Sequence, residues 1–133
     1  MDVREATPDD LPPAATVLDA AMLATDDLPA AVRAGRVLVA VEEGRVLGAL
    51  VVAAPASVPD WSHERDADAH VEAVAVRRRR RGQGVGTVLV EAALSRGDRL
   101  TAAFDPVVAP FYESLGFAIE RTGDRWRGWY GPE

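Results

Sequence analysis

Residues 74–86 read VAVRRRRRGQGVG, and this stretch decides the fold of the chain. A β-branched apolar run meets five arginines, a glycine-rich turn follows, and an apolar helical pattern continues through Leu89, Ala93 and Leu94. A strand, a basic glycine-rich loop and a helix, in this order, place backbone N–H groups and a helix N-terminus around a phosphate group. The stretch therefore predicts a ligand that carries phosphates.

Composition narrows the class of protein. The 133 residues include no Cys and carry a net charge of −6. This length predicts a single domain over residues 1–133, and the absence of thiols excludes disulfides and a cysteine nucleophile. No apolar run approaches the length of a membrane span, and the N-terminus lacks a signal-peptide layout, so we expect a cytoplasmic protein with no membrane partner. The acidic balance argues against a nucleic-acid partner, although the arginine run keeps that alternative open.

Hydrophobic periodicity predicts a mixed α/β domain with the element order ααβββαβαββ. Helices are expected from Thr7 as N-cap to about Met22, over 28–34, from the glycine loop to about Arg96, and over 106–115. Strands are expected over 37–41, 46–53, 70–76, 100–104, 117–121 and 125–130. The polar residues 55–68 are expected to form a loop.

Two motifs resemble those of the GNAT acetyltransferase superfamily. Residues 81–86, RGQGVG, resemble its Arg/Gln-x-x-Gly-x-Gly/Ala signature, and residues 109–117, APFYESLGF, resemble its later Phe-Tyr-x-x-x-Gly-Phe motif. The resemblance covers nearly the whole chain and implies a GNAT-like mixed, mostly antiparallel central sheet flanked by helices. It also implies an acetyl-CoA-dependent N-acetyltransferase that moves the acetyl group directly from the thioester to a primary amine.

The glycine loop is the cofactor-binding part of this resemblance. Glycines have no side chain to keep a phosphate from the backbone, and in the family the amides of this loop bind the pyrophosphate of acetyl-CoA. The preceding strand is implied to hold the pantetheine arm with main-chain groups. The implied cofactor-binding residues are Val74, Ala75, Val76, Arg81, Gly82, Gln83, Gly84, Val85, Gly86 and Thr87. One departure is Pro106, which stands where many relatives have a CoA-contacting asparagine.

Three residues are candidates for the chemistry. Tyr112 matches the family tyrosine that lies near the CoA sulfur as general acid, and a core tyrosine is the alternative. Glu72 and His70 are the candidates for the base, and Glu72 is favoured because a carboxylate also attracts a cationic amine. Both precede the strand end by an even number of residues, so we expect them to share a face with Val74 and Val76.

The identity of the acceptor is left open by the sequence. A small-molecule or peptide amine fits equally, and the acidic cast of residues 60–68 would favour a cation unless that loop is merely solvated. Trp126 and the pair Trp129 and Tyr130 suit an acceptor pocket less well than core or homodimer packing. No metal is expected. A CoA-binding or sensor module of the same fold, without catalysis, is the alternative function.

Overall fold

The computed structural model describes residues 1–20 and 27–131, so that Met22 lies outside the described residues. The helices are α1 (Leu11–Ala20), α2 (Leu28–Arg33), α3 (Asp60–Glu64), α4 (Val85–Leu94) and α5 (Ala109–Ser114), with short 3-10 turns at Pro8–Asp10, Pro55–Ser57, Arg78–Arg80 and Pro106–Val108. The strands are β1 (Asp2–Glu5), β2 (Val37–Glu42), β3 (Arg45–Val52), β4 (Ala69–Val76), β5 (Leu100–Phe104), β6 (Ala118–Glu120) and β7 (Trp126–Tyr130).

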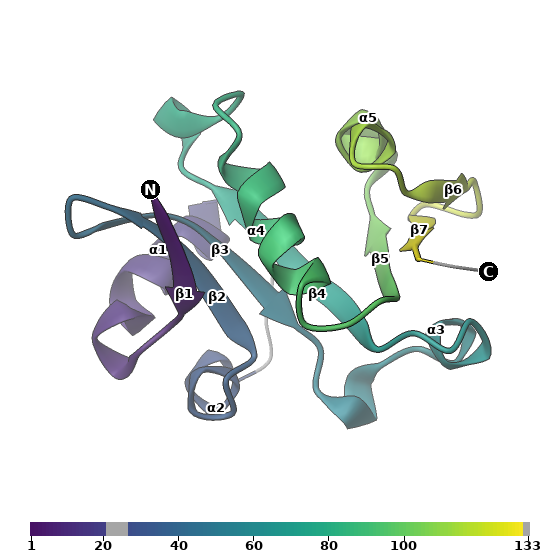
Figure 1. Cartoon of the computed structure of the whole chain (residues 1–133), viewed down its shortest axis with the longest axis horizontal. Helices are drawn as coiled ribbons and strands as arrows, with labels where there is room; N and C mark the ends of the chain where they lie inside the picture. Colours follow the sequence, from purple (N-terminus) through teal and green to yellow (C-terminus); the bar gives the residue numbers. More distant parts are fainter. Residues whose placement is uncertain (21–26, 132–133) are drawn as a thin grey trace.

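The strands form one sheet in the order β1-β2-β3-β4-β5-β7-β6. Neighbouring strands run antiparallel, except that β4 and β5 are parallel. The last strand, β7, is inserted between β5 and β6. The expectation of a mixed, mostly antiparallel sheet flanked by helices is confirmed (Figure 1).

The two faces of the sheet bury two separate apolar cores. Alternate residues of β2 supply them: Leu38 and Ala40 pack with α4, whereas Val37 and Val39 pack with α1 and α2. Both faces are covered, so β2 and β3 read as continuous apolar runs rather than alternating ones. In Figure 1, α4 crosses in front of the central strands and α1 lies behind them. No helix in the described part of the chain is long and apolar enough to cross a membrane.

A glycine in β3 lets α4 approach the sheet closely. A Cβ atom built on Gly48 would lie 2.8 Å from the carbonyl oxygen of Ala75, 3.0 Å from Val85 Cγ1 and 3.1 Å from Leu89 Cδ1. These separations are below van der Waals contact, so only glycine fits here. The position of the first turn of α4, and of the loop before it, therefore depends on Gly48.

The expected elements occur in the expected order, but two further elements, β1 and α3, were not predicted. The strand β1 was missed because its residues are exposed or half-buried at an edge, where no apolar alternation marks them. The expected loop over 55–68 contains a 3-10 turn and the helix α3, whose Ser62 is fully buried against β5. Helix α3 has five residues, which is too few for a periodic pattern to stand out.

Candidate active site

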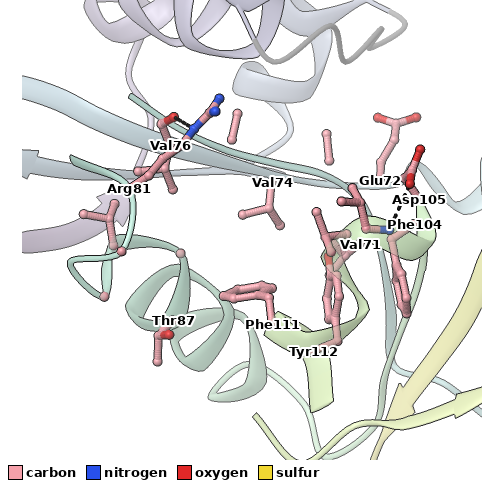
Figure 2. A pocket seen from close by; sticks show the side chains of 18 of the residues that line it. Val71, Glu72, Val74, Val76, Arg81, Thr87, Phe104, Asp105, Phe111 and Tyr112 are labelled. Carbon is pink, nitrogen blue, oxygen red and sulfur yellow. Dashed lines mark hydrogen bonds between the residues drawn. The ribbon is translucent and has the colours of Figure 1, made fainter. Parts of the chain in front are cut away.

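A cavity opens where β4 and β5 separate. The two strands pair only from Ala69↔Leu100 to Val71↔Ala102, after which β4 continues along β3 as far as Val76. The space between them, about 750 Å³, is bounded by β4, the glycine loop, the start of α4, the end of β5 and α5. Figure 2 shows Val74 on the β4 side and Phe111 and Tyr112 on the facing α5 side.

The glycine loop forms one end of this cavity. Gly82 and Gly84 have φ values of 77° and 84°, which L-residues with side chains rarely adopt. A Cβ atom at either position would meet nothing within 4 Å, so the backbone of the loop faces open space. Gly84 is the N-cap of α4 and supplies no side-chain hydrogen bond. The first amides of α4 and its positive dipole end are thus available to an anion.

Two of the arginines before this loop are used to hold it. Arg77 Nε donates to the Val46 carbonyl at 2.6 Å, and Arg80 pairs with Glu42 at 2.5 Å and also donates to Gln83 Oε1 at 2.7 Å. Charge-assisted bonds of this kind stiffen a loop. Part of the arginine run over residues 77–81 therefore stabilises the loop, whether or not the other arginines contact a ligand.

The predicted cofactor-binding residues lie together, with one exception. Nine of them line the cavity: Val74, Ala75, Val76, Arg81, Gly82, Gly84, Val85, Gly86 and Thr87. The exception is Gln83, whose amide bonds to Arg80 and to the Arg79 carbonyl instead. Arg81 reaches back across the loop, donating from Nε to the Val76 carbonyl at 3.3 Å.

Tyr112 reaches the cavity from α5. Its ring stacks on Phe104 with centroids 4.3 Å apart and meets Phe117 edge-on at 5.2 Å. Burial raises the pKa of the phenol to about 12, against a smaller opposing effect of the Arg125 charge. Within the described residues the hydroxyl has no hydrogen-bond partner, yet its oxygen is not sealed from solvent. An unpartnered hydroxyl on an otherwise packed side chain is available to a ligand.

The expectation that His70 and Glu72 share a face with Val74 and Val76 was wrong. A β-bulge shifts the register, because Ala73 pairs with Val51 while Val71 pairs with the next residue, Val52. The extra residue, Glu72, reverses the alternation, so Val71 joins the α4-side core together with Val74 and Val76. Figure 2 shows the Glu72 side chain on the side of β4 away from Tyr112, although Glu72 still lines the cavity.

His70 lies outside the residues that line the cavity. It is buried with 7% exposure, and its Nδ1 is 2.9 Å from Thr101 Oγ1, which in turn bonds to Ser62 Oγ at 2.5 Å. Its ring meets Trp61 edge-on at 5.7 Å. Burial lowers the pKa of His70 to about 4, with a smaller contribution from the Arg125 charge. These contacts anchor α3 to the paired part of β4 and β5.

Sequence reasoning missed Phe104, Asp105 and Arg125 as lining residues. Asp105 begins the 3-10 turn after β5, accepting from the Val107 N–H at 2.9 Å. Arg125 precedes β7 and donates from Nη2 to the Ala103 carbonyl at 2.7 Å. No local pattern marks Arg125, because its place at the cavity depends on the insertion of β7 beside β5.

The terminal aromatic residues lie elsewhere. Trp129 packs under the Arg65 guanidinium, 3.2 Å from ring centroid to Cζ, and Tyr130 contacts the Phe117 ring with centroids 5.6 Å apart. Trp126 lies beneath Arg121 at 5.1 Å. None of these three lines the cavity between β4 and β5. Their contacts are those of packing residues on β7, next to the edge strand β6.

The chain was compared with known proteins. The family model described as an acetyltransferase (GNAT) domain matches residues 33–119. No curated protein sequence matches the chain. Ard1 from Thermoplasma volcanium has 19% identity and a TM-score of 0.76, with 99% of this chain and 98% of that chain covered.

Two further solved structures share the fold. Naa20 from Chaetomium thermophilum, in complex with a bisubstrate analogue, has 19% identity and a TM-score of 0.71, covering 99% of this chain and 86% of its own. N-acetylglutamate synthase from Neisseria gonorrhoeae, complexed with coenzyme A and N-acetyl-glutamate, has 15% identity and a TM-score of 0.75. The match covers 97% of this chain but only 34% of the synthase chain.

Proposed function

Because the chain belongs to the GNAT acetyltransferase family and is thus an acyltransferase, we propose that it moves the acetyl group of acetyl-CoA directly to a primary amine. The observation that carries this proposal is the unpartnered Tyr112 hydroxyl, which lies in the cavity where β4 leaves β5. We further propose that residues 1–133 act as one domain in the cytoplasm.

The donor would bind on the α4 side of the gap. From Ala73 to Val76, β4 pairs with β3 along one edge, and no other strand of the described residues pairs with its second edge. An extended, amide-bearing pantetheine arm can add to such an edge as a further strand. The pyrophosphate would then lie at Gly82 and Gly84, whose backbone faces open space at the positive end of α4.

The acceptor would approach from the opposite side of β4. Glu72 points to that side and still lines the cavity, so its carboxylate is placed to attract an ammonium group and to take a proton from the attacking nitrogen. The amine nitrogen forms a bond to the carbonyl carbon, the carbon–sulfur bond breaks, and CoA leaves as a thiolate. The proton released by the amine passes to Glu72 and then to solvent, and the thiolate takes up a proton.

Tyr112 would stabilise the departing thiolate as a hydrogen-bond donor. Its raised pKa of about 12 keeps the phenol protonated across the working range of pH. Stabilising charge as it develops in the transition state is the contribution that raises kcat rather than affinity alone.

The test is release of free thiol from acetyl-CoA over a panel of primary amines. We expect turnover with at least one amine, and Glu72→Gln should lower kcat/KM for that amine by roughly 10²- to 10⁴-fold. Glu64→Gln, which removes an acid of neighbouring α3 that does not line the cavity, is the matched control and should change little. Tight CoA binding with no thiol release over the whole panel would instead establish a binding module.

A further inference from the structure

Arg125 is a cation at the end of the cavity away from the glycine loop, which we call the acceptor end. The proposed acetyl-CoA site does not need its charge. Resting on the proposed function, we infer that Arg125 selects acceptors that carry a carboxylate near the reactive amine. The favoured acceptor class is therefore an amino acid or another aminocarboxylate, rather than a simple amine or polyamine.

The position of Arg125 is set by its backbone neighbours. It lies just before β7, and its Nη2 donates to the carbonyl of Ala103, the residue at which β5 is already separate from β4. This single hydrogen bond at 2.7 Å holds the guanidinium at the wall of the cavity. It occupies one of the five N–H donors of the guanidinium, so the other four remain available to a ligand. No ion pair within the described residues includes Arg125.

The negative charges of acetyl-CoA belong at the other end of the cavity. Its phosphates would lie at the glycine loop, where Arg80 and Arg81 are also found, whereas the thioester is neutral. Arg125 shares its part of the wall with Ala103, Phe104 and Tyr112, and its charge acts on the phenol of Tyr112 and on His70. An anionic group that this cation meets must therefore come from the acceptor.

Three charged side chains border the acceptor end: Glu72 from β4, Asp105 after β5, and Arg125. Two carboxylates and one guanidinium suit a molecule with both an ammonium and a carboxylate, since each group then finds its opposite. Glu72, already proposed to take the proton of the amine, is the group that would receive the ammonium, while Asp105 caps the turn after β5 by accepting the Val107 N–H through Oδ1. The planar guanidinium of Arg125 offers paired donors to a carboxylate.

The experiment compares matched acceptors on wild-type protein and Arg125→Gln. Each set consists of an amino acid, its carboxamide and the amine that lacks the carboxyl group, assayed at one pH, with kcat/KM corrected for the fraction of each amine that is neutral. Wild-type protein should prefer the carboxylate by at least tenfold in kcat/KM. Arg125→Gln should lower kcat/KM for the carboxylate by roughly 10- to 100-fold, mainly through KM, and leave the two other acceptors within about twofold.

Two control variants keep the result interpretable. Arg121→Gln removes an arginine of the same β6–β7 segment that stacks over Trp126 and does not line the cavity, so it should leave the preference intact. Arg125→Lys retains the charge and should restore part of the preference. Equal losses on all three acceptors, or a wild-type preference for amines without a carboxylate, would overturn the inference and leave the proposed function standing. Failure to acetylate any amine would overturn both.

Discussion

Replacing Tyr112 with Phe tests the chemistry with little change to the fold. The substitution removes one oxygen and keeps the ring that stacks on Phe104 at 4.3 Å and meets Phe117 at 5.2 Å. The hydroxyl has no partner within the described residues, so no protein hydrogen bond is lost. The free energy of unfolding should therefore change by less than about 1 kcal/mol.

The size of the catalytic effect follows from the pKa of the phenol. Tyr112 has a pKa of about 12, whereas an ordinary thiol has one of about 8.5. Complete transfer of the proton from the phenol to a free thiolate would thus be uphill by about 5 kcal/mol. A hydrogen bond to the developing thiolate is available without that cost, and bonds to charged groups contribute about 1.5–3 kcal/mol. Tyr112→Phe should accordingly lower kcat by roughly 10- to 150-fold.

The assay is single-turnover release of thiol, followed from pH 6 to 10.5 in both proteins. The phenol stays protonated below its pKa of about 12, so Tyr112 should add no fall in rate at the basic end of this range. An unchanged chemical step in Tyr112→Phe would remove the tyrosine from the mechanism. A basic limb near pH 9 that the substitution abolishes would show instead that the phenol ionises there, against the reasoning from burial.

Two further predictions concern binding and stability. Gly84→Ala and Gly44→Ala both place a methyl group at a φ near 80°, where no other atom lies within 4 Å of it. Each substitution should therefore lower the free energy of unfolding by about 1–2 kcal/mol. Only Gly84 lies in the cavity loop, so only Gly84→Ala should also raise the Kd for CoA, measured by calorimetry, at least tenfold. The pKa of His70 is about 4 in the folded protein, against 6.5 for an unperturbed histidine. Between pH 4 and 6.5 the unfolded chain therefore binds a proton at His70 that the folded protein does not bind. Stability should thus fall by roughly 2–3 kcal/mol from pH 6.5 to 4 in denaturant titrations, and His70→Gln, which can still bond to Thr101, should lack this dependence. Equal CoA affinities in the two glycine variants, or the same slope with and without His70, would contradict these expectations.

The sequence predicts the elements that carry strong periodic or turn signals. The β2–β3 hairpin is an example: Glu43 and Gly44 both adopt positive φ, at 50° and 78°, as a tight two-residue turn requires. The glycine loop and α4 are predictable for the same reason, because their backbone conformations demand particular residues. Edge strand β1 and helix α3 have no residue whose backbone conformation marks them in the sequence, because both are short. Contacts with distant residues hold them in place: β1 pairs with β2, and Ser62 of α3 bonds to Thr101.

The faces of β4 could not be predicted from the strand alone. A period of two is a sound expectation within an unbroken strand, but the bulge at Glu72 depends on how β4 pairs with β3. His70 consequently bonds to Thr101 on the far face rather than facing the cavity. Arg125 was missed for a similar reason, because residues about twenty positions apart meet only through the insertion of β7 beside β5.

The gap between β4 and β5 results from a local distortion at the end of the paired region of each strand. On β4 the bulge falls at Glu72, immediately after Val71, the last residue paired with β5, and an extra residue bends a strand away from its neighbour. On β5 the chain turns out after Phe104, because Asp105 caps a 3-10 turn whose first residue, Pro106, has no N–H to donate to a ladder.

Pro106 thereby gains a physical role at the position where the family resemblance implies an asparagine. Its turn ends β5 and carries Val107, 78% exposed, to the rim of the cavity. An asparagine here would offer an amide to the donor, but it would not restrict the backbone in the same way. The chain therefore keeps the opening by backbone geometry, and we expect the proposed binding of CoA to depend more heavily on the glycine loop and on the free edge of β4.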